Sequence, residues 1–445
     1  MAEEVEEKKS FLDKFAEVSA KIGNQVHLRS LRDAFATMTP IYILAGIAVL
    51  INNVVFPLFL TGDALKSAQY WGSSITLGTL NFSAVILAGL IGYCFARNKR
   101  FDNPIACVVV GIASLVIMMP QTVTVTTDAT AGTTADVTGA FLTSSTGTNG
   151  LFAAIIIGLI ATTIFIKFSS IEKLKINLGE GVPPAVGDSF NVMTPMLITL
   201  SIMALVSALL YGLFATNLLA IIAVAVTAPL KNIMNAGPLA VVIIYTFANL
   251  LFCLGIHQST ISGVLAEPIL TVLIVDNMAT FAAGGTIPVD HYMNMQIVNT
   301  FALIGGSGCT LMLLFDTFLF SKNKTSRDIA KLSILPGIFN INEPVIYGYP
   351  IVYNLPLIIP FVVVPDLLIA ATYGLTCIGL ISPCVVMVPW TTPVLLSGWL
   401  ATAGDFRAVI WQVIEIAVSM AIYLPFMKIS ERAQAKQLEN ASEEE

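Results

Sequence analysis

The sequence predicts an all-α polytopic membrane protein with about ten transmembrane helices, and three observations support this prediction. Of the 445 residues, 56% are hydrophobic and only 11% are charged, whereas soluble globular proteins usually carry about 25% charged residues. The charged residues gather at the two ends and in short segments between apolar runs. Several of these runs extend for about 20 residues, the length of a helix that crosses a bilayer.

The N-terminal half contains five expected spans separated by segments of contrasting charge. Lys and Arg occur near Arg32, from Arg97 to Arg100 and from Lys167 to Lys175, so the positive-inside rule places these segments in the cytoplasm. The segment 121–150 is rich in Thr, Ser and Gly and contains no Lys or Arg, which predicts an external loop. Both termini are then cytoplasmic. The expected spans cover residues 31–59, 78–96, 104–120, 151–168 and 191–214.

The C-terminal half is less regular. Pro, Gly and polar residues interrupt two of its apolar stretches, at 337–348 and 381–399. Irregular backbone at membrane depth is stable only where protein or a wet cavity satisfies its polar groups, and broken helices typically mark a transporter's binding site. We therefore expect a scaffold in the N-terminal half and the site in the C-terminal half. Residues 218–234 look amphipathic, and further spans are expected at 239–257, 301–320, 354–375 and 409–426.

Glu343 lies between two apolar runs, in the sequence GIFNINEPVIYG. A carboxylate inside a membrane segment costs about 3 kcal/mol or more unless it faces a cavity or a partner. Because Pro344 suits the first turn of a helix, we expect Glu343 to cap a half-helix that points into a cavity. Its carboxylate and the amides of Asn340 and Asn342 would bind hydroxyl groups, which suits a sugar. The alternative is a solvated cytoplasmic loop.

His257 ends the apolar run 239–257 and is followed by Gln258. Imidazole can donate or accept a hydrogen bond and exchange a proton near neutral pH, so this polar break is a candidate site; a structural histidine is the alternative. Trp390, with prolines on either side, is either an aromatic platform for a sugar ring or an interfacial anchor. His291 is expected to be a loop residue.

Other features suggest no chemistry. The six cysteines lie in or beside apolar runs without metal-ligand spacing, so we expect small buried hydrophobes. Asp316 and Glu415 are expected at helix ends. The sequence contains no phosphate-cradling motif and no nucleophile elbow, so no cofactor is expected. The net charge of −6 comes largely from the acidic ends and does not favour a nucleic-acid partner.

Three segments together resemble a known family: GIFNINEPVIYGYPIVYNLPLIIPF, GIHQS and GEGVPPAVGDSF. The chain is similar over nearly its whole length to the membrane IIC component of the bacterial phosphoenolpyruvate-dependent sugar phosphotransferase system, in the lactose, cellobiose and diacetylchitobiose branch. The resemblance implies a homodimeric elevator-type transporter in the bacterial cytoplasmic membrane, with two re-entrant hairpins around a β-disaccharide. It implies a cytoplasmic segment at 1–30, a scaffold and dimerisation domain at 31–215, a transport domain at 216–430 and a cytoplasmic tail at 431–445.

The resemblance also implies roles for the candidate residues. Glu343 matches the carboxylate that contacts the sugar's 6-hydroxyl, with Asn342 as its neighbour, and His257 matches the histidine of a Gly-Ile-His motif. Glu343 and His257 would orient this hydroxyl and accept its proton, and Trp390 matches an aromatic of the sugar pocket. Where family members often have Trp before the histidine and Gly after it, this chain has Phe252 and Gln258. These two positions therefore bear on the identity of the sugar.

The phosphoryl donor implied by the resemblance is a phosphocysteine on the IIB component, which is supplied through IIA, HPr and enzyme I. No cysteine of this chain lies in a soluble segment, so a separate IIB protein and a cellobiose- or chitobiose-type substrate are expected. One alternative is an ion-coupled sugar symporter with Glu343 as its protonation site. Another is an enzyme that acts on a lipid-linked sugar, which should have acid pairs or metal-binding carboxylates on loops; the sequence has neither.

Overall fold

The computed structural model describes residues 25–128, 133–176, 184–227, 229, 238–349, 351–352 and 354–443. These residues are mostly helical and divide into two compact units. Val26–Ile233 and Met278–Thr286 form the first unit, and Met234–Asn277 and Ile287–Glu445 form the second. The helix α14 (Glu267–Ala282) therefore begins in the second unit and ends in the first.

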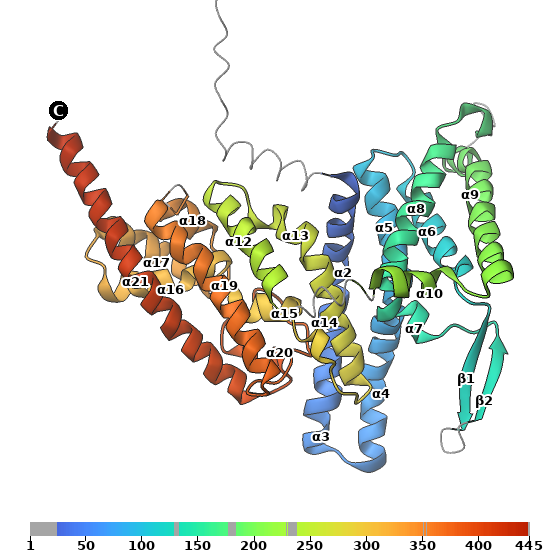
Figure 1. Cartoon of the computed structure of the whole chain (residues 1–445), viewed down its shortest axis with the longest axis horizontal. Helices are drawn as coiled ribbons and strands as arrows, with labels where there is room; N and C mark the ends of the chain where they lie inside the picture. Colours follow the sequence, from blue (N-terminus) through green and yellow to red (C-terminus); the bar gives the residue numbers. More distant parts are fainter. Residues whose placement is uncertain are drawn as a thin grey trace, which may run out of the picture. The chain divides into compact units, whose positions relative to one another are not determined.

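The first unit is a helical bundle in which α5, α6 and α8 pack against one another (Figure 1). A Cβ atom at Gly92 would lie 2.3 Å from the carbonyl oxygen of Cys107, and one at Gly111 would lie 2.5 Å from that of Ala88. Glycine thus permits the close approach that holds membrane helices together. The elements are α2 (Val26–Leu50), η1 (Ile51–Val55), α3 (Phe56–Phe59), α4 (Gly62–Gly78), η2 (Leu80–Phe82), α5 (Ser83–Asn98), α6 (Pro104–Ile117), α7 (Thr143–Thr146), η3 (Thr148–Gly150), α8 (Leu151–Ser169), η4 (Glu172–Leu174), α9 (Pro184–Phe214), α10 (Leu218–Ile222) and η5 (Ala223–Thr227).

Part of the Thr-rich segment forms an antiparallel hairpin, which the all-α prediction did not include. Strand β1 (Thr122–Asp128) pairs with β2 (Thr133–Thr138) in the first unit (Figure 1). Thr124 lies opposite Asp136, and its hydroxyl donates a hydrogen bond to the Asp136 carboxylate at 2.7 Å. Alternating Thr and Val residues favour strands because their β-branched side chains fit a pleated surface, so the signal for this hairpin was present in the sequence.

The second unit packs α19 against α12 and α21, and α16 against α21. Polar contacts join these helices: the Thr246 hydroxyl donates to the Asp366 carboxylate at 2.6 Å, and the Tyr423 hydroxyl donates to the Gly308 carbonyl. The elements after α12 (Leu239–Cys253) are η6 (Gln258–Thr260), α13 (Ser262–Leu265), α14, η7 (Val289–His291), α15 (Met295–Ile297), η8 (Val298–Ala302), η9 (Ser307–Cys309), α16 (Thr310–Phe320), α17 (Lys324–Ile338), α18 (Glu343–Gly348), α19 (Leu355–Cys377), α20 (Leu396–Ala401) and α21 (Phe406–Glu443).

The described residues contain seven helices that are long and apolar enough to cross a membrane, or eight if the bent pair Gln258–Leu265 and Glu267–Ala282 is one span. The chain is therefore a multi-pass membrane protein. Two further apolar helices are shorter: α6, at the expected third span, has 14 residues, and α12 ends at Cys253, before His257. The expected span 301–320 lies within one of the seven, Met295–Phe320, and glycines with positive φ make its backbone irregular between η8 and α16.

Several smaller expectations need correction. Asp316 and Glu415 do not lie at helix ends: both are fully buried, within α16 and α21. His291 lies in a connecting segment as expected, but it is buried and its Nδ1 lies 3.1 Å from the Asp276 carboxylate. Five of the six cysteines are buried as expected, whereas Cys377 is exposed.

Candidate functional site

Glu343 lies where the chain passes from α17 to the short helix α18 in the second unit. It is the first residue of α18, and Pro344 occupies the first turn as expected. Asn342 occupies the cap position, so the expectation that Glu343 itself caps this helix was wrong. The Glu343 side chain is exposed, and its carboxylate makes no hydrogen bond or ion pair to any residue that the structure describes. The carboxylate is therefore available to a ligand.

Asn340 connects three segments of the second unit. Its backbone has a φ of 63°, a left-handed conformation that Asn adopts more readily than most residues. Its amide nitrogen donates to the carbonyl oxygens of Trp390 at 2.6 Å and Thr392 at 3.2 Å, and its amide oxygen accepts from the Gly305 N–H at 2.7 Å. The sequence predicted Asn340 as a sugar ligand, but the folded chain uses both ends of its amide to hold backbone.

Asn342 is buried, with 5% of its surface exposed. Its amide nitrogen donates to the Ser307 carbonyl at 2.7 Å and to the Thr310 hydroxyl at 3.1 Å. Gly306 makes this arrangement possible, because a Cβ atom there would lie 2.5 Å from Asn342 Cγ. The buried amide therefore fixes the start of α18, and with it the position of Glu343, against the glycine-rich loop before α16.

His257 is the residue before η6, and its Nδ1 accepts from the Ser259 N–H at 3.2 Å and lies 2.9 Å from the Ser259 hydroxyl. Its ring packs on Phe252 with 4.7 Å between centroids, and Phe252 packs edge-on against Phe361 at 6.0 Å. Phe252 is 1% exposed, so it supports the imidazole and has almost no surface of its own to offer a sugar.

His257 and Glu343 interact electrostatically. Burial lowers the pKa of His257 below its ordinary value of 6.5, and the nearby Glu343 carboxylate partly opposes this shift. A chain of contacts also joins the two residues: Phe361 packs over Gly308, where a Cβ atom would lie 2.1 Å from the Phe361 ring, and the Gly308 loop is held by Asn342. The structure thus brings together two residues that are 86 positions apart in the sequence (343 − 257).

Trp390 and Gln258 differ in exposure. Trp390 is 54% exposed while its carbonyl is held by Asn340, so the indole belongs to the same assembly as Glu343. Gln258 is 8% exposed, and its Oε1 has no hydrogen-bond partner among the described residues. A buried amide oxygen without a partner is costly unless water or a ligand hydroxyl reaches it.

Gln412 is a supporting residue that sequence reasoning missed. It is fully buried in α21, and its Oε1 accepts from the N–H groups of Leu395 and Gly398 at 2.8 and 3.2 Å. Its Nε2 donates to the Thr300 carbonyl at 2.9 Å and the Ser397 hydroxyl at 3.0 Å. These bonds fix the segment that follows Trp390. The available signal was an uncharged amide inside the apolar run 409–426.

The described residues contain no group of three or more His, Cys, Asp or Glu side chains that could hold a metal ion. The assembly instead presents a free carboxylate, an imidazole and an exposed indole, and the unpaired amide oxygen of Gln258 is buried next to His257 in the sequence. Such groups can hydrogen-bond and stack against a neutral polyhydroxylated molecule, and the carboxylate can accept a proton from one of its hydroxyls.

Comparison with known proteins gives consistent results. A family model described as Phosphotransferase system, EIIC matches residues 32–365. The chain is 30% identical over 435 residues to the oligo-beta-mannoside-specific EIIC component of Bacillus subtilis (strain 168), covering 96% of this chain and 95% of that protein. It is 29% identical over 427 residues to the cellobiose-specific EIIC component of Geobacillus stearothermophilus, covering 95% and 94%.

A solved structure matches the whole fold. The crystal structure of the transporter ChbC, the IIC component of the N,N'-diacetylchitobiose-specific phosphotransferase system, superposes with a TM-score of 0.87 at 30% sequence identity. The match covers 96% of this chain and 99% of that chain.

Proposed function

Because the chain belongs to the Phosphotransferase system EIIC family of membrane sugar transporters, we propose that it imports a β-linked disaccharide, with cellobiose as the first candidate. It presents the 6-hydroxyl of this sugar for phosphorylation at the cytoplasmic side. The observation that carries the proposal is the exposed Glu343 carboxylate, which has no hydrogen-bond or ion-pair partner among the described residues and acts electrostatically on His257. Relatives named for cellobiose and N,N'-diacetylchitobiose support the substrate class.

The proposed reaction transfers a phosphoryl group from a phosphocysteine on a separate IIB protein. The 6-oxygen of the sugar attacks phosphorus, the P–S bond breaks, and the cysteine leaves as a thiolate. The hydroxyl proton passes to the Glu343 carboxylate, while His257 orients the hydroxyl. Phosphoryl transfer depends mainly on alignment and charge stabilisation, and proton acceptance by a positioned base contributes about 10²–10⁴-fold. The six cysteines of this chain lie in or beside apolar segments, which favours a donor on another protein, supplied through IIA, HPr and enzyme I.

The other residues of the site either contact the sugar or hold the contacting residues in position in this proposal. Trp390 stacks against the apolar face of a sugar ring, and Gln258 Oε1 accepts a hydrogen bond from a sugar hydroxyl. Asn340 and Asn342 act as positioning residues, because their amides are engaged with the backbone and a neighbouring hydroxyl. Phe252 acts through His257, on which it packs.

We further propose that the first unit is the scaffold and dimerisation domain, and that the second unit is the transport domain of an elevator-type homodimer. In this proposal the protein lies in the bacterial cytoplasmic membrane with both termini in the cytoplasm. The distribution of Lys and Arg around the N-terminal helices supports this orientation, and the location of the candidate site within the second unit supports the division of labour.

Uptake into membrane vesicles tests the function. Purified protein in phospholipid vesicles would receive radiolabelled cellobiose, with and without the phosphorylated IIB partner, and the sugar inside would be identified. Cellobiose 6-phosphate that appears only with the partner is the expected result. Free cellobiose that accumulates against its gradient without the partner, driven by a pH difference, would favour a symporter instead. Uptake and phosphorylation of chitobiose instead of cellobiose would show that the substrate is different, and the proposed mechanism would still apply.

A further inference from the structure

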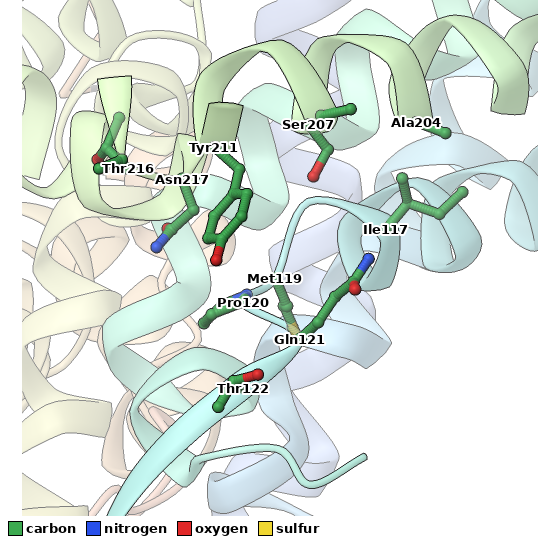
Figure 2. A pocket seen from close by; sticks show the side chains of 12 residues that line it. Ile117, Met119, Pro120, Gln121, Thr122, Ala204, Ser207, Tyr211, Thr216 and Asn217 are labelled. Carbon is green, nitrogen blue, oxygen red and sulfur yellow. The ribbon is translucent and has the colours of Figure 1, made fainter. Parts of the chain in front are cut away.

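A cavity of about 540 Å³ lies within the first unit, between the end of α6, the start of β1 and the end of α9 (Figure 2). Its volume lies within the range of 300–1,000 Å³ that is typical of small-molecule sites. All of its lining residues belong to the first unit, whereas Glu343 and His257 belong to the second. None of the described residues that line it carries a charge.

One face of α9 forms a wall of this cavity. Ala204, Ser207, Ala208 and Tyr211 all line it, and their spacing of three, four and seven residues places them on a single helical stripe. The three small side chains leave room between α9 and the end of α6, and Tyr211 projects at the end of the stripe with 78% of its surface exposed. A wide recess bordered by an aromatic ring results.

The polar groups in the cavity are available for binding. The side chains of Gln121, Ser207 and Tyr211 have no hydrogen-bond partner within the described part of the chain. Ser207 and Tyr211 point from α9 toward Pro120 and Gln121 on the opposite wall (Figure 2). Asn217 Oδ1 accepts from the Ala220 N–H at 3.0 Å and so caps α10, and its amide nitrogen remains available.

A second recess of about 310 Å³ adjoins the first, because both are lined by Pro120 and Asn217. Its walls add Ser144, Ser145 and Asn149, which again carry hydroxyl and amide groups without charge. Such groups donate and accept hydrogen bonds, as ligand hydroxyls do. The described lining residues carry no charge that would offset the cost of removing a phosphate, a carboxylate or a cation from water.

We propose that this pair of recesses binds a neutral glycosyl group, with Tyr211 against the sugar ring and Gln121, Ser207 and Asn217 on its hydroxyls. Aromatic rings and uncharged polar groups together suit the two faces and the edge of a sugar. The glycosyl group can come from a free disaccharide or from the head of a neutral glycolipid, whose apolar tail would contact Ile117 and Met119. The site is separate from Glu343 and does not depend on the proposed transport reaction.

Photolabelling of the purified full-length protein tests this proposal. The protein would be placed in phosphatidylglycerol nanodiscs and exposed to three diazirine probes: an octyl β-glucoside, an octyl phosphocholine with the same tail, and tailless cellobiose. Mass spectrometry would locate the labelled peptides. Saturable labelling around residues 117–122 and 204–217 by a glycosyl probe, at least 10-fold above the phosphocholine probe, is the expected result. Labelling by cellobiose would identify a free saccharide as the source, and labelling by the glucoside alone would identify a glycolipid.

Matched variants make the result specific. Ala208→Phe fills the recess and should reduce labelling about 10-fold, whereas Leu205→Phe, at a 60% exposed α9 position that does not line it, should leave labelling unchanged. Tyr211→Ala removes an exposed ring and should weaken labelling without affecting the fold. Glu343→Gln should label like the parent, which separates this site from the transport site. Three results would overturn the proposal. These are equal labelling by the phosphocholine probe, labelling that neither Ala208→Phe nor Tyr211→Ala reduces, and no labelling at all.

Discussion

Single residues in the site divide into those that face a ligand and those that hold the others in place. Glu343 makes no hydrogen bond or ion pair to a described residue, whereas Asn340 and Asn342 form hydrogen bonds to groups 32 to 52 residues away. The sequence predicted all three as sugar ligands, because a polar cluster between apolar runs signals a site. It could not distinguish their roles, since the partners of the two amides are brought close only by folding.

Replacing Glu343 with Gln tests the proton acceptor. The amide retains the shape of the carboxylate and one oxygen that accepts hydrogen bonds, but it cannot take up the hydroxyl proton, so Glu343→Gln should bind cellobiose while phosphorylation falls by about 10²-fold or more. Equilibrium binding and single-turnover assays with phosphorylated IIB would measure the two effects. Glu172→Gln, at an exposed ion pair in the first unit, is the control. Phosphorylation at the full rate would remove the proposed role.

The titration of His257 tests its contact with Glu343. Burial holds the pKa of His257 below 6.5 and the Glu343 carboxylate raises it, so loss of the carboxylate in Glu343→Gln should lower the pKa further. In the parent protein the imidazole is then neutral at pH 7, and phosphorylation should fall only as pH decreases through the lowered pKa. Nuclear magnetic resonance of labelled histidines would follow the midpoint, which should stay constant in Glu172→Gln. A midpoint that rises in Glu343→Gln would contradict the contact.

At the level of elements, irregular segments determine the site more than the long helices do. The glycine-rich loop before α16, the turn at Asn340 and the segment that contains Trp390 are joined by side-chain amides from Asn340, Asn342 and Gln412. The sequence predicted that the segments 337–348 and 381–399 are irregular, because Pro and Gly interrupt them. Which segments meet depends on hydrogen bonds between distant residues, and no local pattern encodes these.

Asn340→Asp tests the link between Glu343 and Trp390. Asp tolerates the left-handed backbone and can still accept from the Gly305 N–H, but it places an oxygen against the Trp390 and Thr392 carbonyls. Loss of these bonds should raise the Kd for cellobiose about 10-fold, equivalent to about 1.4 kcal/mol. Isothermal titration would measure it. Asn103→Asp, where Asp caps α6 equally well, should leave the affinity unchanged.

Gly306→Ala tests the packing of the glycine-rich loop. Gly306 has a φ of 91°, and an added Cβ would displace the Asn342 side chain. Gly62 has a φ of 59° with open space around it, so Gly62→Ala carries backbone strain of about 1–2 kcal/mol without a clash, whereas Gly306, with a ψ of −169°, lies in a region that essentially only glycine adopts. We expect the melting temperature of Gly306→Ala to be lower by roughly 4 °C or more than that of Gly62→Ala. Equal melting temperatures would mean that neither the backbone conformation of Gly306 nor the displacement of Asn342 adds a cost beyond that of Gly62→Ala.

At the level of the whole molecule, two compact units share one continuous chain, and α14 passes from one unit to the other at Asn277 and Met278. The sequence predicted a division into an N-terminal scaffold and a C-terminal part that holds the site, because interrupted apolar runs occur mainly after residue 216. The return of Met278–Thr286 to the first unit had no signal in the sequence. Composition along the chain reports local environment and does not report which distant segments pack together.

Membrane orientation is a whole-molecule property that cysteine labelling can test. With Cys377, the exposed cysteine of the described residues, replaced by Ala, single cysteines would be introduced as Thr134→Cys in β2 and Ser170→Cys after α8. A membrane-impermeant maleimide should label position 134 in intact cells and position 170 only after permeabilisation, because the positively charged segment stays in the cytoplasm. The reverse pattern would invert the proposed topology.

The sequence by itself determined the class of protein and the place to look for its site. Repeated apolar runs of about 20 residues are typical of helices that cross a bilayer, and a carboxylate between them needs a cavity or a partner. The tertiary structure decided which polar groups form hydrogen bonds within the protein and which remain available to a ligand. Only packing brought His257 into the field of Glu343, placed Phe252 beneath it and formed the recess beside Tyr211. Such contacts form only when folding brings residues that are distant in the sequence close together, whereas hydropathy and charge patterns are local properties of the sequence.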